Sequence, residues 1–174
     1  GTTLQFATAP NYEAPGCGSS SNSCSVTVRA TDAAGTATDL TITVTINDLN
    51  DQTPSWTTAN TASVNENSQT VATLAATDTD TADSNGLAYT IATNDNDLFE
   101  IDGTTLQFAT APNYEAPGCG NPAANSCSVT VRATDAAGAT ADLTITVTIN
   151  DLNDQTPVYN LSLIHISEPT RRSY

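Results

Sequence analysis

The feature that most constrains this chain is an internal repeat about a hundred residues long. The segment from Gly1 to Pro54 recurs almost unchanged from Gly103 to Pro157, an offset of 102 residues that rises to 103 after one inserted residue. Such similarity indicates recent tandem duplication, and the period is the length of one β-sandwich domain. A chain of 174 residues therefore has room for one complete module and for pieces of its neighbours.

The repeat predicts where the modules begin and end. Residues 1–51 are the second half of one repeat, residues 52–154 a complete repeat, and residues 155–160 the start of another. The segment from Leu161 to Arg171 breaks this composition and resembles an in-frame translation of a transposase-end sequencing adapter. We expect residues 161–174 to be a non-native tail. A genuine C-terminus is the alternative. Both ends look like cuts of a longer chain.

Strict alternation of apolar and hydroxyl residues predicts strands. Leu143, Ile145, Val147 and Ile149 alternate with threonines, and the first copy repeats the pattern over residues 40–46. Further strands are expected at 62–67, 71–76, 87–92, 98–101, 105–108 and 128–133. One face of each strand is apolar and the other hydroxylated. This pattern predicts an all-β fold, an antiparallel Greek-key immunoglobulin-like β-sandwich.

Residues 1–51 contain only the last strands of such a sandwich. The inner face and the strand edges of this half-repeat would be exposed. The sequence of this half-repeat is also nearly that of residues 103–151. We predict either that the half-repeat is poorly anchored or that it competes with residues 103–151 for the rest of the complete repeat.

The charge of the chain excludes several classes of partner. The chain has nineteen acidic residues and four basic ones, for a net charge of −15. Nothing here could neutralise nucleic-acid phosphates or bind an anionic membrane surface. The excess of acidic residues suits the binding of multivalent cations. Solubility in a salty medium explains part of the same excess. No window has the apolar length of a membrane span. His165, in the tail, is the single histidine, and no nucleophile or phosphate motif is present, so we expect no enzyme.

The acidic residues cluster where strands end. Asp-x-Asn-Asp follows the last strand of each copy, at residues 48–51 and 151–154, and alternate residues of an extended segment share a face. Other acids at strand ends and turns are Glu13, Asp32, Glu66, Asp78, Asp80, Glu115 and Asp135. Asp and Asn also favour turns, which explains single positions better than the whole set. Like charges about 4 Å apart repel by about 4 kcal/mol at an effective dielectric near 20, so converging carboxylates indicate a cation.

These elements resemble, in order, the cadherin repeat. The matching motifs are Asn65-Glu66-Asn67, Asp78-Thr79-Asp80, Asn113-Tyr114-Glu115, the turn from Ala133 to Gly138, and the Asp-x-Asn-Asp linker before Pro157. The resemblance covers residues 1–157. It implies that Ca²⁺ lies between successive repeats, held by oxygens from both repeats and from the linker.

The resemblance also implies which residues bind the ions. At the first junction they would be Glu13, Asp48, Asn50, Asp51, Asp78, Asp80, Asp135 and the backbone carbonyl of Asn85. At the second junction they would be Glu66, Glu115, Asp151, Asn153 and Asp154. We expect neither junction to be complete in this chain, because each lacks part of a neighbouring repeat.

Five residues depart from the family pattern or need a separate explanation. Asn11 and Asn113 stand where the family usually has Asp, so one ion should bind weakly. Gln52 and Gln155 replace a frequent Asn, at a position that usually contributes backbone oxygen. Trp56 follows the linker, and we expect an aromatic anchor at the domain entrance rather than strand-swapped adhesion.

Four cysteines form two repeated pairs. Cys17 and Cys24 recur as Cys119 and Cys127, each pair flanking a short polar loop. Even number and close spacing favour two local disulfides and an oxidising compartment. A metal site would need a further Cys or His ligand. Closing an eight-residue loop contributes at most about 2.5 kcal/mol in the chain-entropy model.

Cadherin repeats imply a calcium-dependent adhesion protein at the cell surface or outside the cell, attached to membrane or wall or secreted. Its partners would be calcium and other copies of itself, cell-surface proteins or glycans. A passive stalk within a large adhesin is the alternative. Near-identical copies favour the stalk, as does a Lys-free, Thr- and Asp-rich composition that looks prokaryotic. A calcium-free immunoglobulin-like module would lack the Asp motifs.

Overall fold

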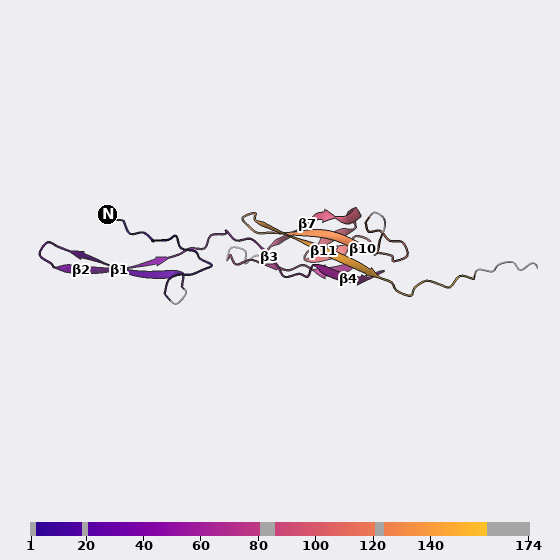
Figure 1. The fold of residues 1–174 in the computed structure, drawn as a ribbon, viewed down its shortest axis with the longest axis horizontal. Coiled ribbons are helices and arrows are strands. Elements are labelled where there is room, and N and C mark those ends of the chain that lie inside the picture. The colour runs from indigo at the N-terminus through magenta and orange to yellow at the C-terminus, as the bar shows by residue number, and fades with distance from the viewer. Residues whose placement is uncertain (1–2, 19–20, 81–85, 121–123, 160–174) are drawn as a thin grey trace, which may run out of the picture.

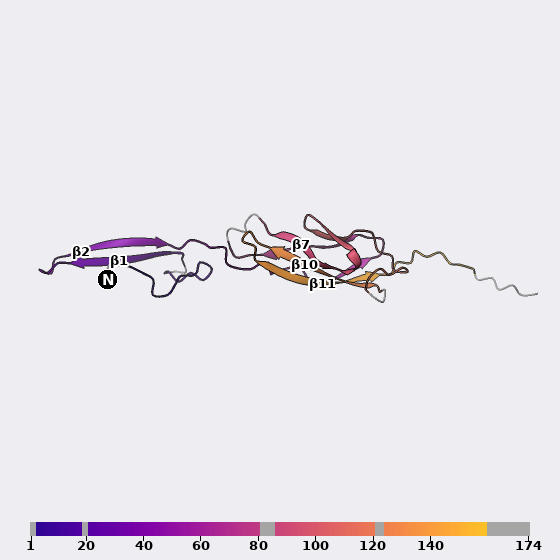
Figure 2. The ribbon, with the colours of Figure 1, turned by 90° about the horizontal axis from the view of Figure 1, so that it is seen from above.

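In the computed structural model, the described residues are 3–18, 21–80, 86–120 and 124–159. They form two parts placed end to end along the long axis (Figures 1 and 2). The first part is a hairpin of β1 (Ser23–Thr31) and β2 (Ala37–Thr45), preceded by extended chain. The second part contains all the remaining strands.

The second part is a sandwich of short strands. One sheet has the order β4 (Thr61–Asn65), β11 (Thr140–Asn150), β10 (Ser126–Thr134) and β7 (Ala88–Asn94). A second sheet has the order β5 (Thr70–Thr73), β9 (Thr105–Phe108) and β8 (Phe99–Asp102). A small sheet pairs β3 (Ser55–Trp56) with β6 (Ala76–Thr77), and the 3₁₀ turn η2 (Asp95–Asp97) links β7 to β8. The predicted all-β sandwich is confirmed. No helix among the described residues is long and apolar enough to span a membrane.

The first and last long strands of the sandwich run in the same direction. β4 and β11 pair in parallel, with Val64 opposite Ile149, while the other described strand pairs are antiparallel. The chain therefore enters the sandwich at one end and leaves it at the other. Figure 1 shows the consequence, because the linkers before β3 and after β11 emerge from opposite ends. This geometry lets successive repeats extend as a line.

Alternation along β10 and β11 builds the core. Val129, Val131, Ile145 and Val147 are fully buried, whereas the alternating Thr144, Thr146 and Thr148 of β11 are exposed. These side chains pack with apolar residues of β4, β5, β8 and β9 in one cluster. The period of two therefore buries one side of each strand, as the sequence predicts.

The disulfides and the packing of Trp56 also confirm predictions. Disulfides join Cys17 to Cys24 and Cys119 to Cys127. Trp56 is half-buried, its ring centroid lies 5.4 Å from that of Tyr89, and its indole N–H donates to the carbonyl of Ala141 at 2.9 Å. The indole thereby fastens the entering strand to β11, as expected of an aromatic anchor.

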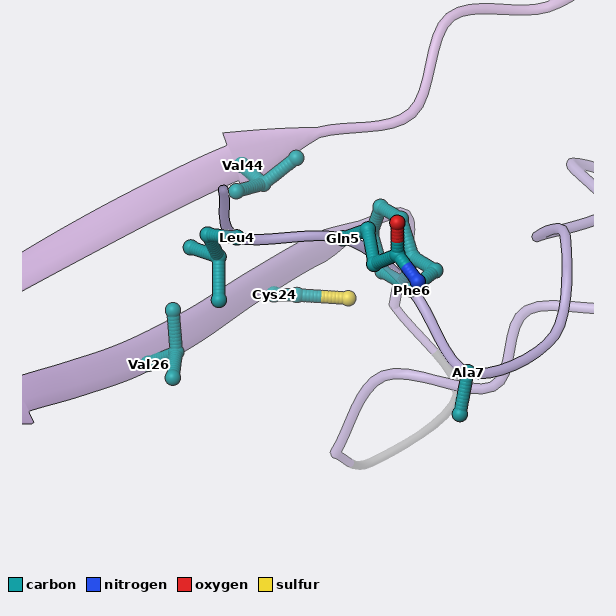
Figure 3. Close-up of a pocket in the computed structure, with 7 residues that line it drawn as sticks. All are labelled: Leu4, Gln5, Phe6, Ala7, Cys24, Val26 and Val44. Carbon is teal, nitrogen blue, oxygen red and sulfur yellow. The ribbon is translucent and has the colours of Figure 1, made fainter. Parts of the chain in front are cut away.

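The half-repeat exposes the face that the complete repeat buries. Leu4 and Phe6 (Figure 3) are 52% and 44% exposed, whereas their copies Leu106 and Phe108 are 0% and 1% exposed. Residues 3–8 form no strand, although the matching residues make β9. Among the described residues of 1–51, none is buried. The predicted exposure of the inner face is confirmed, while competition between the two copies stays a prediction.

Matched truncations of Phe108 and Phe6 test this difference. Phe108→Ala should lower the free energy of unfolding by about 3–5 kcal/mol, because it empties a buried site beside Phe99. Phe6→Ala removes the same atoms from an exposed site and should cost less than about 1 kcal/mol. Urea denaturation at fixed calcium measures both. Equal losses would show that the two faces are buried alike.

Candidate metal centres

Three carboxylates from two successive repeats converge at the first junction. Glu13, Asp48 and Asp80 each place one oxygen within 4.8 Å of the others. Glu13 lies in the loop before the first disulfide, Asp48 follows β2, and Asp80 follows β6 of the complete repeat. The cluster therefore bridges the half-repeat, the linker and the complete repeat.

An asparagine shapes the loop that carries each loop glutamate. The side-chain oxygen of Asn11 accepts hydrogen bonds from the backbone N–H groups of Glu13 and Ala14, at 2.8 and 3.2 Å. In the second copy, Asn113 accepts from Glu115 at 2.9 Å and from the next residue at 3.2 Å. These local bonds are typical of Asx turns. The asparagine oxygens are thus engaged by the backbone of their own loop.

Asp80 joins the linker to the complete repeat. It is 3% exposed, and its Oδ2 accepts a hydrogen bond from the backbone N–H of Gln52 at 2.8 Å. Asp78 accepts from the backbone N–H of Asp80 at 3.1 Å through its Oδ1. Asp80 Oδ1 and Asp78 Oδ2 are buried and accept no hydrogen bond from the described part of the chain.

The turn between β10 and β11 contains a carboxylate of the same kind. Asp135 is 7% exposed, and its Oδ1 accepts from the backbone N–H of Ala139 at 2.7 Å. Gly138 completes the turn at φ +94, a backbone conformation that residues other than glycine rarely adopt. Asp135 Oδ2 is buried and has no donor among the residues that the structure describes. In the first copy, Asp32 caps the equivalent turn and is exposed.

These oxygens test whether the site fits a cation. Buried carboxylate oxygens without hydrogen-bond donors are costly unless a cation or a proton satisfies them. Asp78, Asp80 and Asp135 each present one such oxygen. Hard divalent cations such as Ca²⁺ prefer carboxylate and carbonyl oxygens. The donor set therefore fits calcium.

The electrostatics of Glu13 show the same accumulation of negative charge. A backbone hydrogen bond lowers the pKa of Glu13. Desolvation, the contact with the Asp48 carboxyl group and the charges of Asp51 and Asp80 act in the opposite direction and outweigh it. The net pKa of Glu13 lies above its ordinary value, as expected where negative groups gather.

The remaining residues predicted for the first junction are placed differently. Asn50 is half-buried in the linker, and Asp51 is exposed. The Asp51 carboxylate accepts a hydrogen bond from the Gln52 side chain at 2.6 Å. Asn85 lies outside the described residues. Sequence reasoning missed the Gln52 contact, although the Asp-Gln pair recurs in both linkers and is the signal for it.

A second cluster lies at the far end of the complete repeat. Glu66, Glu115 and Asp151 each place one oxygen within 4.8 Å of the others. Glu66 is 1% exposed and accepts from the backbone N–H groups of Tyr114 and Leu152, both at 2.8 Å. One buried carboxylate thus holds the loop after β9 and the linker after β11. The two other cluster members are exposed.

The rest of the second linker is open to solvent. Asn153 and Asp154 are exposed, and Asp154 accepts from the side chains of Asn67 and Gln155, both at 2.8 Å. By contrast, Asp80 and Asp135, which the complete repeat is predicted to contribute to the first junction, are buried. The structure therefore groups three of the predicted residues at each junction, and only the first group joins two repeats among the described residues.

Fold and clusters together define a linear tandem β-sandwich protein with carboxylate-rich junctions. The profile of the cadherin domain matches residues 60–150. The chain belongs to the cadherin family. Cadherin domains are adhesion modules, so the chain is not an enzyme, in agreement with the prediction.

Solved structures with the same fold are extracellular parts of protocadherins. Human Protocadherin-24 EC1-2 matches with a TM-score of 0.67 and 18% identity over 85% of this chain and 72% of that one. Mouse clustered PcdhgC3 EC1-3 matches with a TM-score of 0.60 and 20% identity, over 83% and 46%. Protocadherin Gamma B2 domains 3-6 match with a TM-score of 0.61 and 25% identity, over 76% and 34%.

The chain covers only part of these proteins. It spans 34% of a Protocadherin gammaB7 EC3-6 structure, with 22% identity and a TM-score of 0.58. No curated protein sequence matches the chain. The comparisons therefore establish the family and the fold.

The buried Glu66 provides a test that is independent of any bound ion. Glu66→Gln replaces an acceptor by an NH₂ group that faces a backbone N–H, so it should lower the free energy of unfolding by about 1–3 kcal/mol in chelator. Amide exchange at Tyr114 and Leu152 should speed up. Glu100→Gln, at an exposed carboxylate, is the control and should change little. Unchanged exchange at both amides would refute the claim that Glu66 holds the loop and the linker.

Proposed function

We propose that the chain is a calcium-binding segment of an extracellular adhesion protein, in which ions rigidify the junctions between successive repeats. The observation that supports this most directly is the cluster of Glu13, Asp48 and Asp80, because its members come from both sides of the linker. Ca²⁺ takes six to eight oxygens at about 2.3–2.6 Å. A bound ion would therefore connect the two repeats.

The proposed ligands are those expected from the family resemblance. The division into residues 1–51 and 52–154 belongs to the same proposal. The first junction would use Glu13, Asp48, Asn50, Asp51, Asp78, Asp80, Asp135 and the backbone carbonyl of Asn85. The second would use Glu66, Glu115, Asp151, Asn153 and Asp154, together with oxygens from a following repeat. The donor-free oxygens of Asp78, Asp80 and Asp135 support the first set.

The mechanism is a change in the sign of the electrostatic interaction. Without a cation, the clustered carboxylates repel, and the repulsion favours an open junction. A divalent cation attracts each of these carboxylates and so holds the linker and the two repeats together. The hydrogen bond from Gln52 to Asp80 already places the linker against the complete repeat. Binding therefore stiffens an existing contact.

Asn11 and Asn113 should limit how much calcium binds. Each amide is neutral, and its oxygen already accepts two backbone hydrogen bonds. An aspartate at the same position would add a full negative charge to the site. We therefore expect weaker binding of one ion at each junction.

Charge-matched variants test the calcium site. Asp80→Asn keeps an acceptor for the Gln52 N–H but removes one charge from the junction, so the calcium affinity should fall about tenfold or more, equivalent to about 1.4 kcal/mol. In chelator, the same variant should open its junction less than the wild type, because repulsion is relieved. Asp102→Asn, at the exposed end of β8, should leave the affinity unchanged. Titration calorimetry and limited proteolysis of the linker measure these effects.

Two results would contradict the calcium proposal. One is the absence of any heat at millimolar calcium for a chain with two intact repeats. The other is equal affinity in the Asp80 and Asp102 variants.

The proposed role of the rigid array is calcium-dependent adhesion, through copies of itself or through surface proteins or glycans. A passive stalk of a large adhesin is the second candidate. The observation that favours the stalk is the near identity of the two copies, since a binding head seldom needs duplication. Both roles use the same calcium junctions.

Sedimentation of a chain with three intact copies of residues 52–154 separates the two roles. Adhesion through copies of itself predicts that calcium increases the weight-average mass and that chelator reverses the increase. A stalk predicts a monomer in both conditions, with calcium changing only the frictional ratio. A constant mass in calcium would therefore reject self-adhesion and leave the rigidifying role intact.

A further inference from the structure

The turn that follows β4 contacts both segments that carry the other proposed ligands of the second junction. Glu66 accepts hydrogen bonds from the loop after β9 and from the linker after β11. Its neighbour Asn67 makes a second pair of contacts to the same two segments. The backbone N–H of Asn67 donates to the carbonyl of Pro112 at 2.9 Å, and its side-chain amide donates to Oδ2 of Asp154 at 2.8 Å. One residue therefore ties the loop to the linker.

The backbone of Asn67 has a conformation that suits glycine better than asparagine. Its φ is +64, in the left-handed region, where the β-carbon disfavours residues other than glycine. Asparagine is one of the few other residues that enter this region readily. Glycine would keep the backbone N–H that donates to Pro112. What asparagine adds at this position is the amide that reaches Asp154.

The carboxylate of Asp154 is held at both of its oxygens. Oδ2 accepts from Asn67, and Oδ1 accepts from the side-chain amide of Gln155 at 2.8 Å. We call Asn67 and Gln155 the amide clamp. An ionised carboxylate has about four lone-pair directions, so the two amides leave about two for a cation. The clamp therefore orients the carboxylate without filling it.

The two donors of the amide clamp are neutral, and this decides what the clamp can do. A guanidinium also holds a carboxylate at both oxygens, as Arg132 does for Asp142 at 2.7 and 2.8 Å, but it offsets the negative charge. An amide orients the carboxylate and leaves its full charge available to a cation. The arrangement around Asp154 is therefore that of a metal ligand held in position, and differs from an ion pair.

We propose that the amide clamp positions Asp154 for the cation of the second junction, with Asn67 setting the linker before the ion arrives. This inference rests on the proposed calcium function, because it concerns how one expected ligand is oriented. Removing a group that hydrogen-bonds to a metal ligand typically costs about 10- to 100-fold in metal affinity. The bond between Asn67 and Asp154 is exposed, so we expect a smaller loss, of about three- to tenfold.

A pair of matched variants in the full chain tests the hold of Asn67 on the linker. Asn67→Gly removes the amide and keeps a residue suited to the left-handed backbone. Asn96→Gly is the control, because Asn96 is also exposed, has a φ of +50, and donates its amide to the carbonyl of Gly118 at 2.7 Å. In chelator, the ¹⁵N heteronuclear NOE of Asp154 should fall in Asn67→Gly and keep its wild-type value in Asn96→Gly.

Calcium titration of the same proteins, followed residue by residue with NMR, tests the positioning role. The backbone amide of Leu152 reports on the second linker, and that of Gln52 reports on the first. Asn67→Gly should raise the calcium dissociation constant at Leu152 about three- to tenfold and leave that at Gln52 unchanged. Gln155→Ala, which removes the other half of the clamp, should act in the same direction. Asn96→Gly should change neither constant.

The other outcomes overturn the proposal at different points. An unchanged NOE of Asp154 in Asn67→Gly would show that the amide does not hold the linker. A lower NOE with an unchanged constant at Leu152 would show that the clamp holds the linker without positioning a ligand. A wild type that responds to calcium at Gln52 alone would refute the positioning role and leave the first junction as proposed. A wild type that responds at neither linker would refute the proposed function itself.

Discussion

Burial of one apolar sheet face by the other half of the repeat is the interaction on which the rest of the structure depends. The chain contains its own comparison, because the same second half occurs twice. Where residues 52–102 cover it, Leu106 becomes buried and its segment becomes strand β9. Where nothing described covers it, Leu4 is exposed and its segment forms no strand. Local sequence therefore fixes the β1–β2 hairpin, while tertiary packing fixes the opposite sheet.

The junction depends on this packing in turn. Asp80 and Asp135 follow strands of the covered sandwich and reach a buried position because those strands are in place. Glu66 is buried for the same reason, and it accepts hydrogen bonds from both the loop and the linker at its end of the repeat. These carboxylates are thus buried because the sandwich around them is stable. Their unmet charge is what a cation can satisfy.

Much of the fold could be predicted from sequence because the alternation of Leu143, Ile145, Val147 and Ile149 gives a strand one apolar face, which a second apolar sheet must cover. The disulfides followed from repeated close spacing. The parallel pairing of β4 with β11 did not, since alternation carries no information on direction. Membership of the two carboxylate clusters was predicted for Glu13 and Glu66 through family resemblance. The repeated Asp-Gln pair marks both linkers, but it does not specify the side-chain rotamers that the bonds from Gln52 and Gln155 to their neighbouring aspartates require.

The parallel pairing of β4 with β11 links the fold of the sandwich to the position of the carboxylates. A sandwich whose chain enters and leaves at opposite ends must place its linker between two modules, so carboxylates at the ends of strands from both modules face the same gap. Glu13 and Asp80 are 67 residues apart in sequence and meet for this reason. A hairpin-like return of the chain would have placed both linkers at one end and left the other end without a partner. The direction of one strand pair therefore determines that acidic residues converge at the junctions, where we propose that a cation stiffens the array.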